Sequence, residues 1–337
     1  MKNKKNILII KPGAIGDLLQ LTPVVRALAS AYPDAGISLL VGTEATAALF
    51  RHHPLVSETI VFDRRGEHRS LLPFLRLWQR IRRGKYSLVV HFQRSNLKTW
   101  LLASAALPCR VLVYHKTRGR PVHVVDDYLE TLAPLGISGQ NRSLELYVGE
   151  IDKKHAGAVF SRCGFDGRIV IALNPGASHP VNRWGASRFA KLADVLTERL
   201  SAKIILIGGT EDRTLAEEIA AAAACGPLVL CGKASLLQTA AILNRCDLLV
   251  SGDTGPLHLA TAVGTRVLAL FGAADPDRTG PVGPGHRVIR AKGVACVPCR
   301  SRACKSSRYL ECMENLSVRE VADAAVAMVE EKQKSRV

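Results

Sequence analysis

Short apolar runs alternate along this chain with longer stretches in which apolar positions recur at helical spacing. In the first half, the runs at residues 6–10, 37–41, 59–62 and 88–92 have the length and content of buried strands, and residues 18–31 fit an amphipathic helix. Strands that alternate with helices predict a parallel sheet, because two parallel neighbours need a crossover connection. The first half is therefore predicted to be an α/β domain.

The alternation starts again after a linker-like stretch at residues 150–167. Two series of about 150 residues each suggest two Rossmann-like domains. We predict an α/β protein with domains at residues 1–160 and 161–337, whose parallel sheets face each other across a cleft. The predicted elements of the second series are residues 168–173, 186–200, 203–208, 214–224, 228–230, 236–244, 247–250 and 267–271.

Length and composition agree with a globular protein of this size. The chain has 337 residues, of which 47% are hydrophobic, and this is enough to bury two cores. Residues 1–5 resemble the basic start of a signal peptide, but the apolar run at residues 7–10 is too short for its hydrophobic region. No uncharged run approaches the roughly 18 apolar residues of a membrane span. We therefore expect a soluble cytoplasmic protein, in which structural disulfides among the nine cysteines are disfavoured.

The net charge of +17 is concentrated in two stretches. Residues 64–120 hold fourteen Lys or Arg and one acid, Glu67, and residues 287–308 hold no acid. Such a field attracts the phosphates of nucleic acids, anionic lipids or phosphorylated sugars, although a basic surface that serves only solubility has the same composition. The chain lacks aromatic residues interleaved with its basic stretches, an RNA-binding signature and Cys-His finger spacing, so a nucleic-acid reader is disfavoured.

The stretch at residues 247–264 predicts a strand that stops at Gly252 and a helix that opens at Asp253 and Thr254. Pro256 suits the first helical turn, because its missing N–H has no partner there. Such a junction directs free backbone N–H groups and the positive end of a helix dipole at one spot beyond the sheet. We expect an anion there; the alternative is an ordinary connection capped by Asp253 or Thr254.

The first predicted strand runs into a turn that contains Gly13 and Gly16, with Asp17 at the mouth of the first helix. The two glycines do not complete the G-x-G-x-x-G fingerprint of a dinucleotide site, so a nicotinamide cofactor is disfavoured. The carboxylate of Asp17 is predicted to face the cleft. As a mere helix cap it would contribute about 1 kcal/mol and no chemistry.

Two further loops follow strands of the second domain. The loop at residues 173–184 is rich in small donors and holds Arg183, which suits an anionic ligand. The loop at residues 208–212 ends in Glu211 and Asp212, whose carboxylates can accept hydrogen bonds from ribose hydroxyls. Each alone fits a solvated turn equally well, but with the strand-to-helix junction they make three such loops at the strand ends of one domain.

Together these stretches resemble glycosyltransferase family 9, the ADP-heptose lipopolysaccharide heptosyltransferases. Residues 11–23 match the family's opening Gly-Asp turn, and residues 174–184 match its Asn-Pro-Gly-Ala loop. Residues 251–258 match its Asp-Thr-Gly-x-x-His signature, and residues 271–283 match its Phe-Gly-x-x-Asp-Pro-x-Arg-Thr-Gly-Pro loop. Four motifs in the family's order, spread over nearly the whole chain, make coincidence improbable.

The resemblance implies a GT-B fold, with the acceptor on the N-terminal domain, the nucleotide-sugar on the C-terminal domain, and inversion at the anomeric carbon. It makes Asp17 the general base, a role typically worth ~10²- to 10⁴-fold in rate. It assigns the ADP leaving group to the N–H groups of Thr254 and Gly255, with the Thr254 hydroxyl and His258 as nearby donors, and a sugar hydroxyl to Asp253. The other implied substrate contacts are Gly16, Ser178 at the phosphates, Glu211 or Asp212 at the ribose, and the backbone near Ala234 at the adenine.

One position departs from the family pattern. A lysine that serves the phosphates commonly precedes the pair formed by a basic residue or histidine and tryptophan, whereas this chain has Asn182 before Arg183 and Trp184. Either Arg183 supplies the charge and binds together with Asn182, or the nucleotide-sugar differs from ADP-heptose.

Two groups of residues raise the question of a metal. The carboxylates of Asp275 and Asp277 have D-x-D spacing, but they lie in a proline-rich loop and the phosphates already have a helix terminus, so we expect a turn, no catalytic metal and no cofactor. In a four-cysteine cluster the first pair has zinc-like spacing and the second pair is too widely spaced, which leaves a structural metal and reduced thiols open. The cluster is Cys296, Cys299, Cys304 and Cys312.

The predicted function is that of an inverting heptosyltransferase, which moves a heptose from ADP-heptose or a related nucleotide-sugar to the lipopolysaccharide inner core at the inner face of the cytoplasmic membrane. The basic residues 64–120 would meet a phosphorylated, membrane-held acceptor. A helix at about residues 317–331 packs back on the first domain in this framework, although an ordinary core-facing helix has the same pattern. The candidate acceptor contacts are Arg94, Lys98, Lys116, Arg118 and Arg120.

Two alternatives remain open. One is another GT-B transferase with a different nucleotide-sugar and acceptor. The other is a non-catalytic protein that binds nucleotides or polyanions, in which Asp17 is only a cap.

Overall fold

The computed structural model describes residues 5–93 and 96–335 of the chain. The chain divides into two compact units, Met1–Tyr147 and Val148–Val337. The division lies earlier than the expected boundary after residue 160. The reason is helix α7 (Glu150–Arg162), which was taken as a linker but packs against α10 (Leu236–Arg245) of the second unit.

The first unit is built on a five-stranded parallel sheet with the order β3-β2-β1-β4-β5. The order reverses at β1, so the carboxyl ends of β1 and β4 diverge into connections on opposite faces, the usual place for a ligand in such a sheet. The strands are β1 (Asn6–Ile10), β2 (Gly36–Val41), β3 (Glu58–Val61), β4 (Leu88–His91) and β5 (Arg110–Val113).

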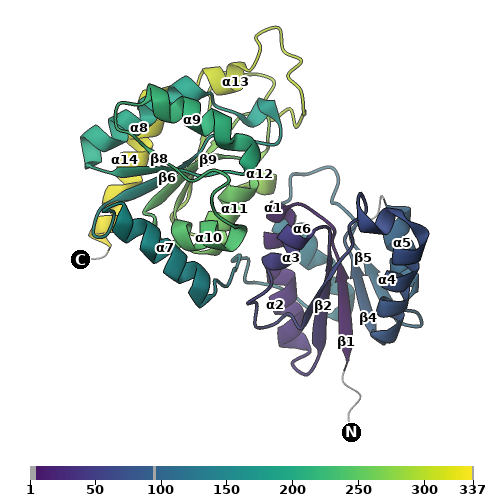
Figure 1. The fold of residues 1–337 in the computed structure, drawn as a ribbon. Coiled ribbons are helices and arrows are strands. Elements are labelled where there is room, and N and C mark those ends of the chain that lie inside the picture. The colour runs from purple at the N-terminus through teal and green to yellow at the C-terminus, as the bar shows by residue number, and fades with distance from the viewer. Residues whose placement is uncertain (1–4, 94–95, 336–337) are drawn as a thin grey trace. The chain divides into compact units, whose positions relative to one another are not determined.

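Helices flank this sheet on both faces (Figure 1). The single helix predicted at residues 18–31 is two helices, because Pro23 has no N–H for the carbonyl of Leu19 and the hydroxyl of Thr22 donates to that carbonyl instead, at 2.7 Å. The α-helices of the unit are α1 (Ile15–Leu19), α2 (Thr22–Ala31), α3 (Glu44–Ala48), α4 (Leu71–Arg83), α5 (Leu97–Ser104) and α6 (Val124–Glu130).

The second unit holds a six-stranded parallel sheet with the order β11-β10-β9-β6-β7-β8. Here the order reverses between β6 and β9, which pair so that Asn174 lies opposite Ser251. Both strands are completely buried, as their apolar runs predicted. The strands are β6 (Val170–Asn174), β7 (Lys203–Leu206), β8 (Leu228–Val229), β9 (Leu248–Gly252), β10 (Val267–Phe271) and β11 (Arg287–Arg290).

The last helix, α14 (Val318–Lys334), packs against α8 (Ala186–Leu200) and β9. Its apolar positions Val321, Ala325 and Val329 are buried in the core of the second unit. Its apolar face therefore serves its own unit, as in an ordinary core-facing helix. The other helices of the unit are α9 (Arg213–Ala222), α11 (Gly255–Ala262), α12 (Pro276–Thr279) and α13 (Glu311–Glu314).

Within the described part of the chain, no helix combines the length and the apolar content needed to cross a membrane.

Candidate active site

Asp17 lies in the first turn of α1, directly beyond the carboxyl end of β1. Its Oδ1 is 3.5 Å from Nζ of Lys11 and accepts a hydrogen bond of 3.3 Å from the hydroxyl of Tyr128. Its Oδ2 accepts the backbone N–H of Ala14 at 3.3 Å, so the carboxylate also caps its own helix. With 42% of the side chain exposed, the carboxylate is held from three sides and remains accessible to a ligand.

The turn before Asp17 leaves little space for a side chain at Gly13. A Cβ atom on Gly13 would stand 3.0 Å from atoms of both Asp17 and Lys11, tighter than ordinary contacts allow. The missing side chain therefore lets the carboxylate and the ammonium group close over the turn.

Tyr128 on α6 completes this cluster from a distant part of the sequence. Its ring is buried among Phe92 and Tyr114, with centroids 5.0 and 5.2 Å away, and Nζ of Lys11 lies 5.1 Å from its centroid. Burial and the neighbouring Asp17 carboxylate raise the pKa of the Tyr128 hydroxyl well above its usual value. Tyr128 therefore stays protonated and acts as a fixed hydrogen-bond donor to Asp17.

Two neighbouring cavities open at this edge of the first sheet. The smaller, of about 430 Å³, is lined by Gly13 and Ala14 of the Asp17 turn and by Arg64 and Arg65. The larger, of about 680 Å³, shares Thr43 and Asp63 with it.

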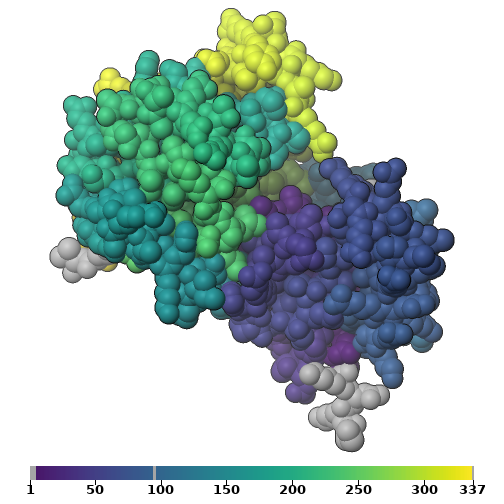
Figure 2. Space-filling view, viewed as in Figure 1, coloured from purple at the N-terminus to yellow at the C-terminus, as the bar shows by residue number. Residues whose placement is uncertain are grey.

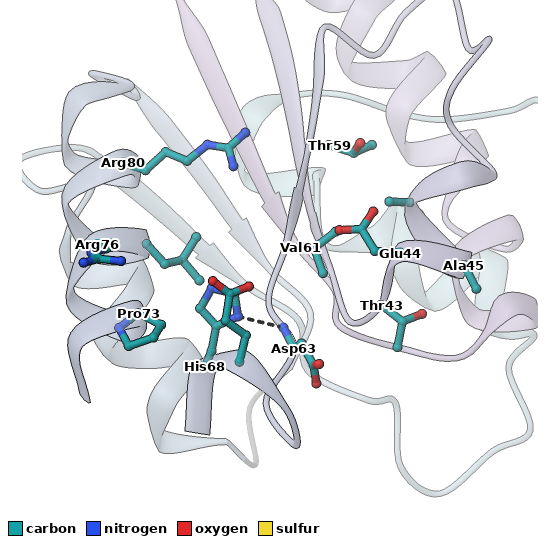
Figure 3. Close-up of a pocket in the computed structure, with 13 residues that line it drawn as sticks. Thr43, Glu44, Ala45, Thr59, Val61, Asp63, His68, Pro73, Arg76 and Arg80 are labelled. Carbon is teal, nitrogen blue, oxygen red and sulfur yellow. Dashed lines mark hydrogen bonds between the residues drawn. The ribbon is translucent and has the colours of Figure 1, made fainter. Parts of the chain in front are cut away.

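In the larger cavity, Arg76 and Arg80 of α4 stand opposite Thr43 and the start of α3, and His68 Nδ1 accepts the backbone N–H of Asp63 at 3.1 Å (Figure 3). Arg80 is paired with Glu58 at 2.5 Å. The cavities thus combine basic side chains with a polar lining.

The five basic residues predicted to contact the acceptor lie in different surroundings. Arg94 lies outside the described residues. The Nζ of Lys98 donates to the carbonyls of His68 and Arg69 at 3.2 and 3.4 Å, so it ties α5 to the segment before α4. The remaining three, Lys116, Arg118 and Arg120, are exposed on the loop after β5.

That loop is anchored close to Tyr128. The hydroxyl of Tyr114 and the backbone N–H of Thr117 donate to the Asp127 carboxylate at 3.2 and 3.3 Å. Asp127 is the neighbour of Tyr128 on α6. The first unit therefore brings basic side chains of this loop to the region of the Asp17 cluster.

In the second unit, the end of β6 is tied to the junction between β9 and α11. The side-chain nitrogen of Asn174 donates to the hydroxyls of Ser251 and Thr254 at 3.0 and 2.9 Å, and to the carbonyl of Gly176 at 3.2 Å. Among the described residues, no side chain caps α11. The alternative of a junction capped by Asp253 or Thr254 is therefore not met in the described residues, and the first turn of α11 presents its N–H groups without a side-chain acceptor.

The loop with Asn182 and Arg183 lies against the same junction. A Cβ atom on Gly252 would stand 2.7 Å from the carbonyl oxygen of Asn182, so the glycine permits direct backbone contact between loop and strand. The guanidinium of Arg183 donates through Nε and Nη2 to the carbonyl of Ala177, at 3.2 and 3.1 Å. An exposed cation is thus fixed on the loop that follows β6.

The carboxyl group of Asp253 has a raised pKa. Burial raises the pKa of its carboxyl from the usual 3.8 to about 6, and a hydrogen bond from the side chain of Thr279 opposes the rise. Near neutral pH a small change in surroundings therefore decides whether Asp253 is ionised.

The other predicted donor-site residues are less uniform. Asp212 accepts the N–H of Gly209 at 3.0 Å and caps its own turn, whereas Glu211 is exposed. The turn before Ala234 is joined to the Glu211 turn by a hydrogen bond of 3.2 Å from Gly232 N–H to the carbonyl of Gly208. Ser178 is exposed and His258 is buried, so of these two only the serine lies on the surface. Gly16 lies within α1, beside Asp17.

Asp275 forms the turn that was expected for it. Its Oδ1 accepts the N–H of Asp277 at 3.3 Å at the start of α12, and its Oδ2 pairs with Arg300 at 2.9 Å.

The four clustered cysteines are free thiols that line a cavity of about 560 Å³. In the described ranges, no three potential metal ligands are placed so that they could hold an ion.

Sequence reasoning missed several members of the site. Lys11 precedes the Gly-Asp turn, so its position at a strand end was a usable signal, and Arg64 and Arg65 open the basic stretch. Tyr128 gave no signal, because it is 111 residues from Asp17. Thr279 lies in the loop at residues 271–283 without any feature that connects it to Asp253.

Known proteins resemble this chain over almost its full length. The model of glycosyltransferase family 9 (heptosyltransferase) matches residues 74–310. Lipooligosaccharide heptosyltransferase 2 of Campylobacter jejuni subsp. jejuni serotype O:2 is 26% identical over 325 residues, which cover 95% of this chain and 97% of that protein.

Solved structures also resemble this chain. A glycosyl transferase family 9 structure from Veillonella parvula has a TM-score of 0.89 and 26% identity, and covers 98% of this chain and 99% of its own. E. coli ADP-heptose lps heptosyltransferase II has a TM-score of 0.78 and 23% identity, with 97% and 99% covered. The predicted GT-B fold class is confirmed.

Proposed function

The chain belongs to glycosyltransferase family 9, and from this premise we propose that it transfers a heptose from ADP-heptose to the inner core of a lipopolysaccharide acceptor, with inversion at the anomeric carbon. The observation that carries the proposal is the Asp17 cluster, a carboxylate that is accessible, held by Lys11 and Tyr128, and adjacent to a polar cavity. The curated relative and the solved structure named above for heptose transfer supply the class of sugar.

In the proposed reaction, Asp17 takes the proton of the acceptor hydroxyl as its oxygen attacks the anomeric carbon. The bond from that carbon to the diphosphate oxygen breaks, and ADP leaves with the electron pair. Attack from the face opposite the leaving group inverts the configuration. A positioned general base contributes ~10²- to 10⁴-fold to such a step.

The departing diphosphate gains charge, and the first turn of α11 is the part of the second unit that suits it. The N–H groups there have no side-chain cap in the described chain, and the helix dipole adds positive potential. The guanidinium of Arg183 is bound to a backbone carbonyl, so its charge is available to a phosphate. This supports the view that Arg183 supplies the charge where Asn182 replaces the usual lysine.

The raised pKa of Asp253 is compatible with a position beside the diphosphate. An ionised carboxylate would repel the phosphates, but a carboxyl with a pKa raised to about 6 accepts a proton readily as negative charge approaches. In the protonated form it donates to a heptose hydroxyl while an oxygen still accepts from Thr279. Glu211, exposed beside the turn of Ala234, then takes the ribose, because Asp212 is engaged in its own turn.

The acceptor sugar is proposed to occupy the cavity of about 430 Å³ beside Asp17. Arg64 and Arg65 in its lining would bind phosphates of the inner core, since guanidinium groups pair well with phosphate. Lys116, Arg118 and Arg120, on the loop anchored near Tyr128, would extend this contact.

The decisive test of the base is Asp17→Asn, with Asp34→Asn as a matched control on an exposed position of the same unit. We expect transfer to fall by about 10²- to 10⁴-fold in the first variant and to stay unchanged in the second. Binding of ADP, measured by calorimetry, should persist in both. Transfer at the wild-type rate by Asp17→Asn would refute the assignment.

The donor and the stereochemistry need separate measurements. Thermal unfolding in the presence of a panel of nucleotide-sugars should show the largest stabilisation with ADP-heptose, since a ligand at 100 times its Kd adds about 2.7 kcal/mol. An NMR spectrum of the product should show the anomeric configuration opposite to that of the donor. A different nucleotide-sugar that protects better would replace ADP-heptose in the proposal.

A further inference from the structure

We propose that the outer surface of α4 and α5 docks on an anionic lipid bilayer, with exposed leucines inserted among the acyl chains and arginines at the headgroups. The inference rests on the proposed function in one respect, since a lipopolysaccharide acceptor is held in a bilayer. Its structural support is independent of the sugar chemistry.

Exposed apolar side chains are concentrated on this surface, which we call the leucine face. Of the ten large hydrophobic residues that are strongly exposed in the described chain, six are leucines of residues 71–107. Their exposed fractions range from 43% to 74%. An apolar group of this density on one surface marks an interaction site, whereas scattered single residues would not. The six are Leu71, Leu72, Leu75, Leu97, Leu101 and Leu107.

The core does not need these leucines. Helix α4 already buries Phe74, Leu77 and Ile81 against the first sheet, and these three positions share one helical face. Leu72 and Leu75 point to the other side of the helix. On α5, Leu97 and Leu101 are four residues apart and share an exposed face, while Leu102 is buried.

The two helices that carry five of these six leucines are neighbours. They pack against each other, and Nζ of Lys98 on α5 donates to the carbonyls of His68 and Arg69, directly before α4. The same ammonium group lies 5.7 Å from the ring centroid of Phe74. The helices lie side by side along one face of the first sheet, and their side chains form an outer surface of the first unit (Figures 1 and 2).

The charge around the leucine face indicates which kind of partner fits it. No Asp or Glu occurs at residues 68–120, and Arg69, Arg76 and Arg83 are exposed on or beside α4. Leucines flanked by arginines fit an interfacial helix on anionic lipid. A second copy of this face would bring like charges together, and a nucleic acid would leave the leucines in water.

The position of the leucine face fits the proposed acceptor site. Leu71 begins α4 after β3, and Leu97 begins α5 after β4, so both lie toward the carboxyl edge of the first sheet, where Asp17 is. Arg76 of α4 also lines the larger cavity. Docking would therefore bring lipid headgroups to the edge at which a membrane-held acceptor enters.

The test compares the full-length protein with Leu71→Ser/Leu72→Ser/Leu97→Ser and with the control Ile151→Ser, an equally exposed aliphatic residue of the second unit. Each is sedimented with vesicles of equal parts phosphatidylglycerol and phosphatidylcholine in about 0.1 M NaCl. We expect the wild type and the control to bind, the triple variant to bind at least tenfold more weakly, and vesicles of phosphatidylcholine alone to bind poorly.

Transfer to a delipidated, soluble core oligosaccharide separates this inference from the proposed function. The triple variant should transfer to this acceptor like the wild type, while its transfer to acceptor embedded in vesicles falls. If no variant transfers heptose at all but the vesicle result holds, the proposed function fails and the docking surface stands. Equal vesicle binding by the wild type and the triple variant would overturn the inference, as would self-association of the wild type that the triple variant loses without any vesicle binding.

Discussion

At the scale of single residues, two carboxyl groups of this enzyme differ because their surroundings differ. Asp17 is accessible and has the ammonium group of Lys11 and the hydroxyl of Tyr128 beside it. Asp253 is half-buried beside the side chain of Thr279, and this desolvation raises its pKa to about 6. The first position leaves a side chain that a ligand can reach, whereas burial at the second favours the protonated form of the carboxyl.

Tyr128→Phe should weaken catalysis without loss of the fold. The change removes one hydrogen bond to Asp17, which is worth about 1–1.5 kcal/mol, so kcat should fall about five- to tenfold while ADP binding is unchanged. Steady-state kinetics with a soluble acceptor provide the measurement. Tyr114→Phe, which removes the neighbouring hydroxyl that bonds to Asp127, serves as the control and should retain a larger share of kcat. An unchanged kcat for Tyr128→Phe would show that this contact does not orient the base.

Asp253→Asn should alter the pH dependence of stability. Since the folded-state pKa is raised from 3.8 to about 6, the folded protein binds this proton more tightly than the unfolded chain does. The contribution of Asp253 to the free energy of unfolding is therefore greatest below about pH 4 and is lost as pH rises to about 6, by at most about 3 kcal/mol. The variant does not titrate, so its stability relative to the wild type should increase by about 1–3 kcal/mol from pH 4 to pH 7.

Urea unfolding of both proteins across this pH range measures the difference. Asp277→Asn, an exposed position on the adjacent turn, is the matched control and should follow the wild type. A constant difference between Asp253→Asn and the wild type over the whole range would contradict the raised pKa. The same variant should lose donor-sugar affinity, because the amide cannot reproduce both forms of the carboxyl.

At the scale of elements, the proposed donor site depends on the contact between one loop and one strand end. The carbonyl of Asn182 lies against Gly252, and Asn174 joins the end of β6 to Ser251 and Thr254. These contacts hold the loop of Arg183 next to the uncapped first turn of α11. The proposed anion site is therefore formed by two connections and not by the helix terminus alone.

Gly252→Ala should separate this loop from the strand. The added Cβ would meet a backbone carbonyl oxygen at 2.7 Å, which has no side-chain freedom to yield. We expect a loss of about 1–3 kcal/mol in the free energy of unfolding and weaker ADP binding by about tenfold. Gly157→Ala on α7, where an added Cβ would meet only a side-chain nitrogen of Arg245 at 3.8 Å, should instead add about 0.5–1 kcal/mol. Denaturant unfolding and calorimetry check both, and wild-type ADP affinity in Gly252→Ala would show that loop contact is not needed.

At the scale of the whole molecule, the enzyme consists of two α/β units that carry different functional groups. The first holds the proposed base, the basic cavities and the leucine face, and the second holds the N–H groups and Arg183 that are proposed to bind a diphosphate. This division also bears on metal dependence, because a helix terminus and a guanidinium can supply the positive field that a divalent cation supplies elsewhere.

Transfer is therefore expected to continue at the wild-type rate, within about twofold, in an excess of EDTA. The measurement is initial-rate transfer with and without chelator, accompanied by metal analysis of the purified protein. The control is Arg183→Gln, which should lose activity under both conditions, since it removes the proposed phosphate cation. Loss of wild-type activity in EDTA and its recovery with one added cation would refute metal independence.

Much of this protein was determined by sequence pattern alone, because the relevant interactions are local. Apolar spacing and the order of strands and helices predicted two parallel-sheet units, and the turn at Asp17 and the junction after Gly252 were visible as strand ends followed by helix starts. The predicted element bounds were wrong in two places. Pro23 split one helix at the carbonyl of Leu19, and α7 had too weak an apolar pattern to be distinguished from a linker.

Only the tertiary structure decided which of these residues act together. Tyr128 reaches Asp17 across 111 residues, and Lys98 turned out to bind carbonyls of its own unit. The raised pKa of Asp253 and the exposure of Leu72 both depend on how far the fold removes each side chain from solvent. The residue type alone does not determine this. A sequence specifies the chemistry of each side chain and its neighbours along the chain, whereas burial and long-range contact exist only once the sheets have packed.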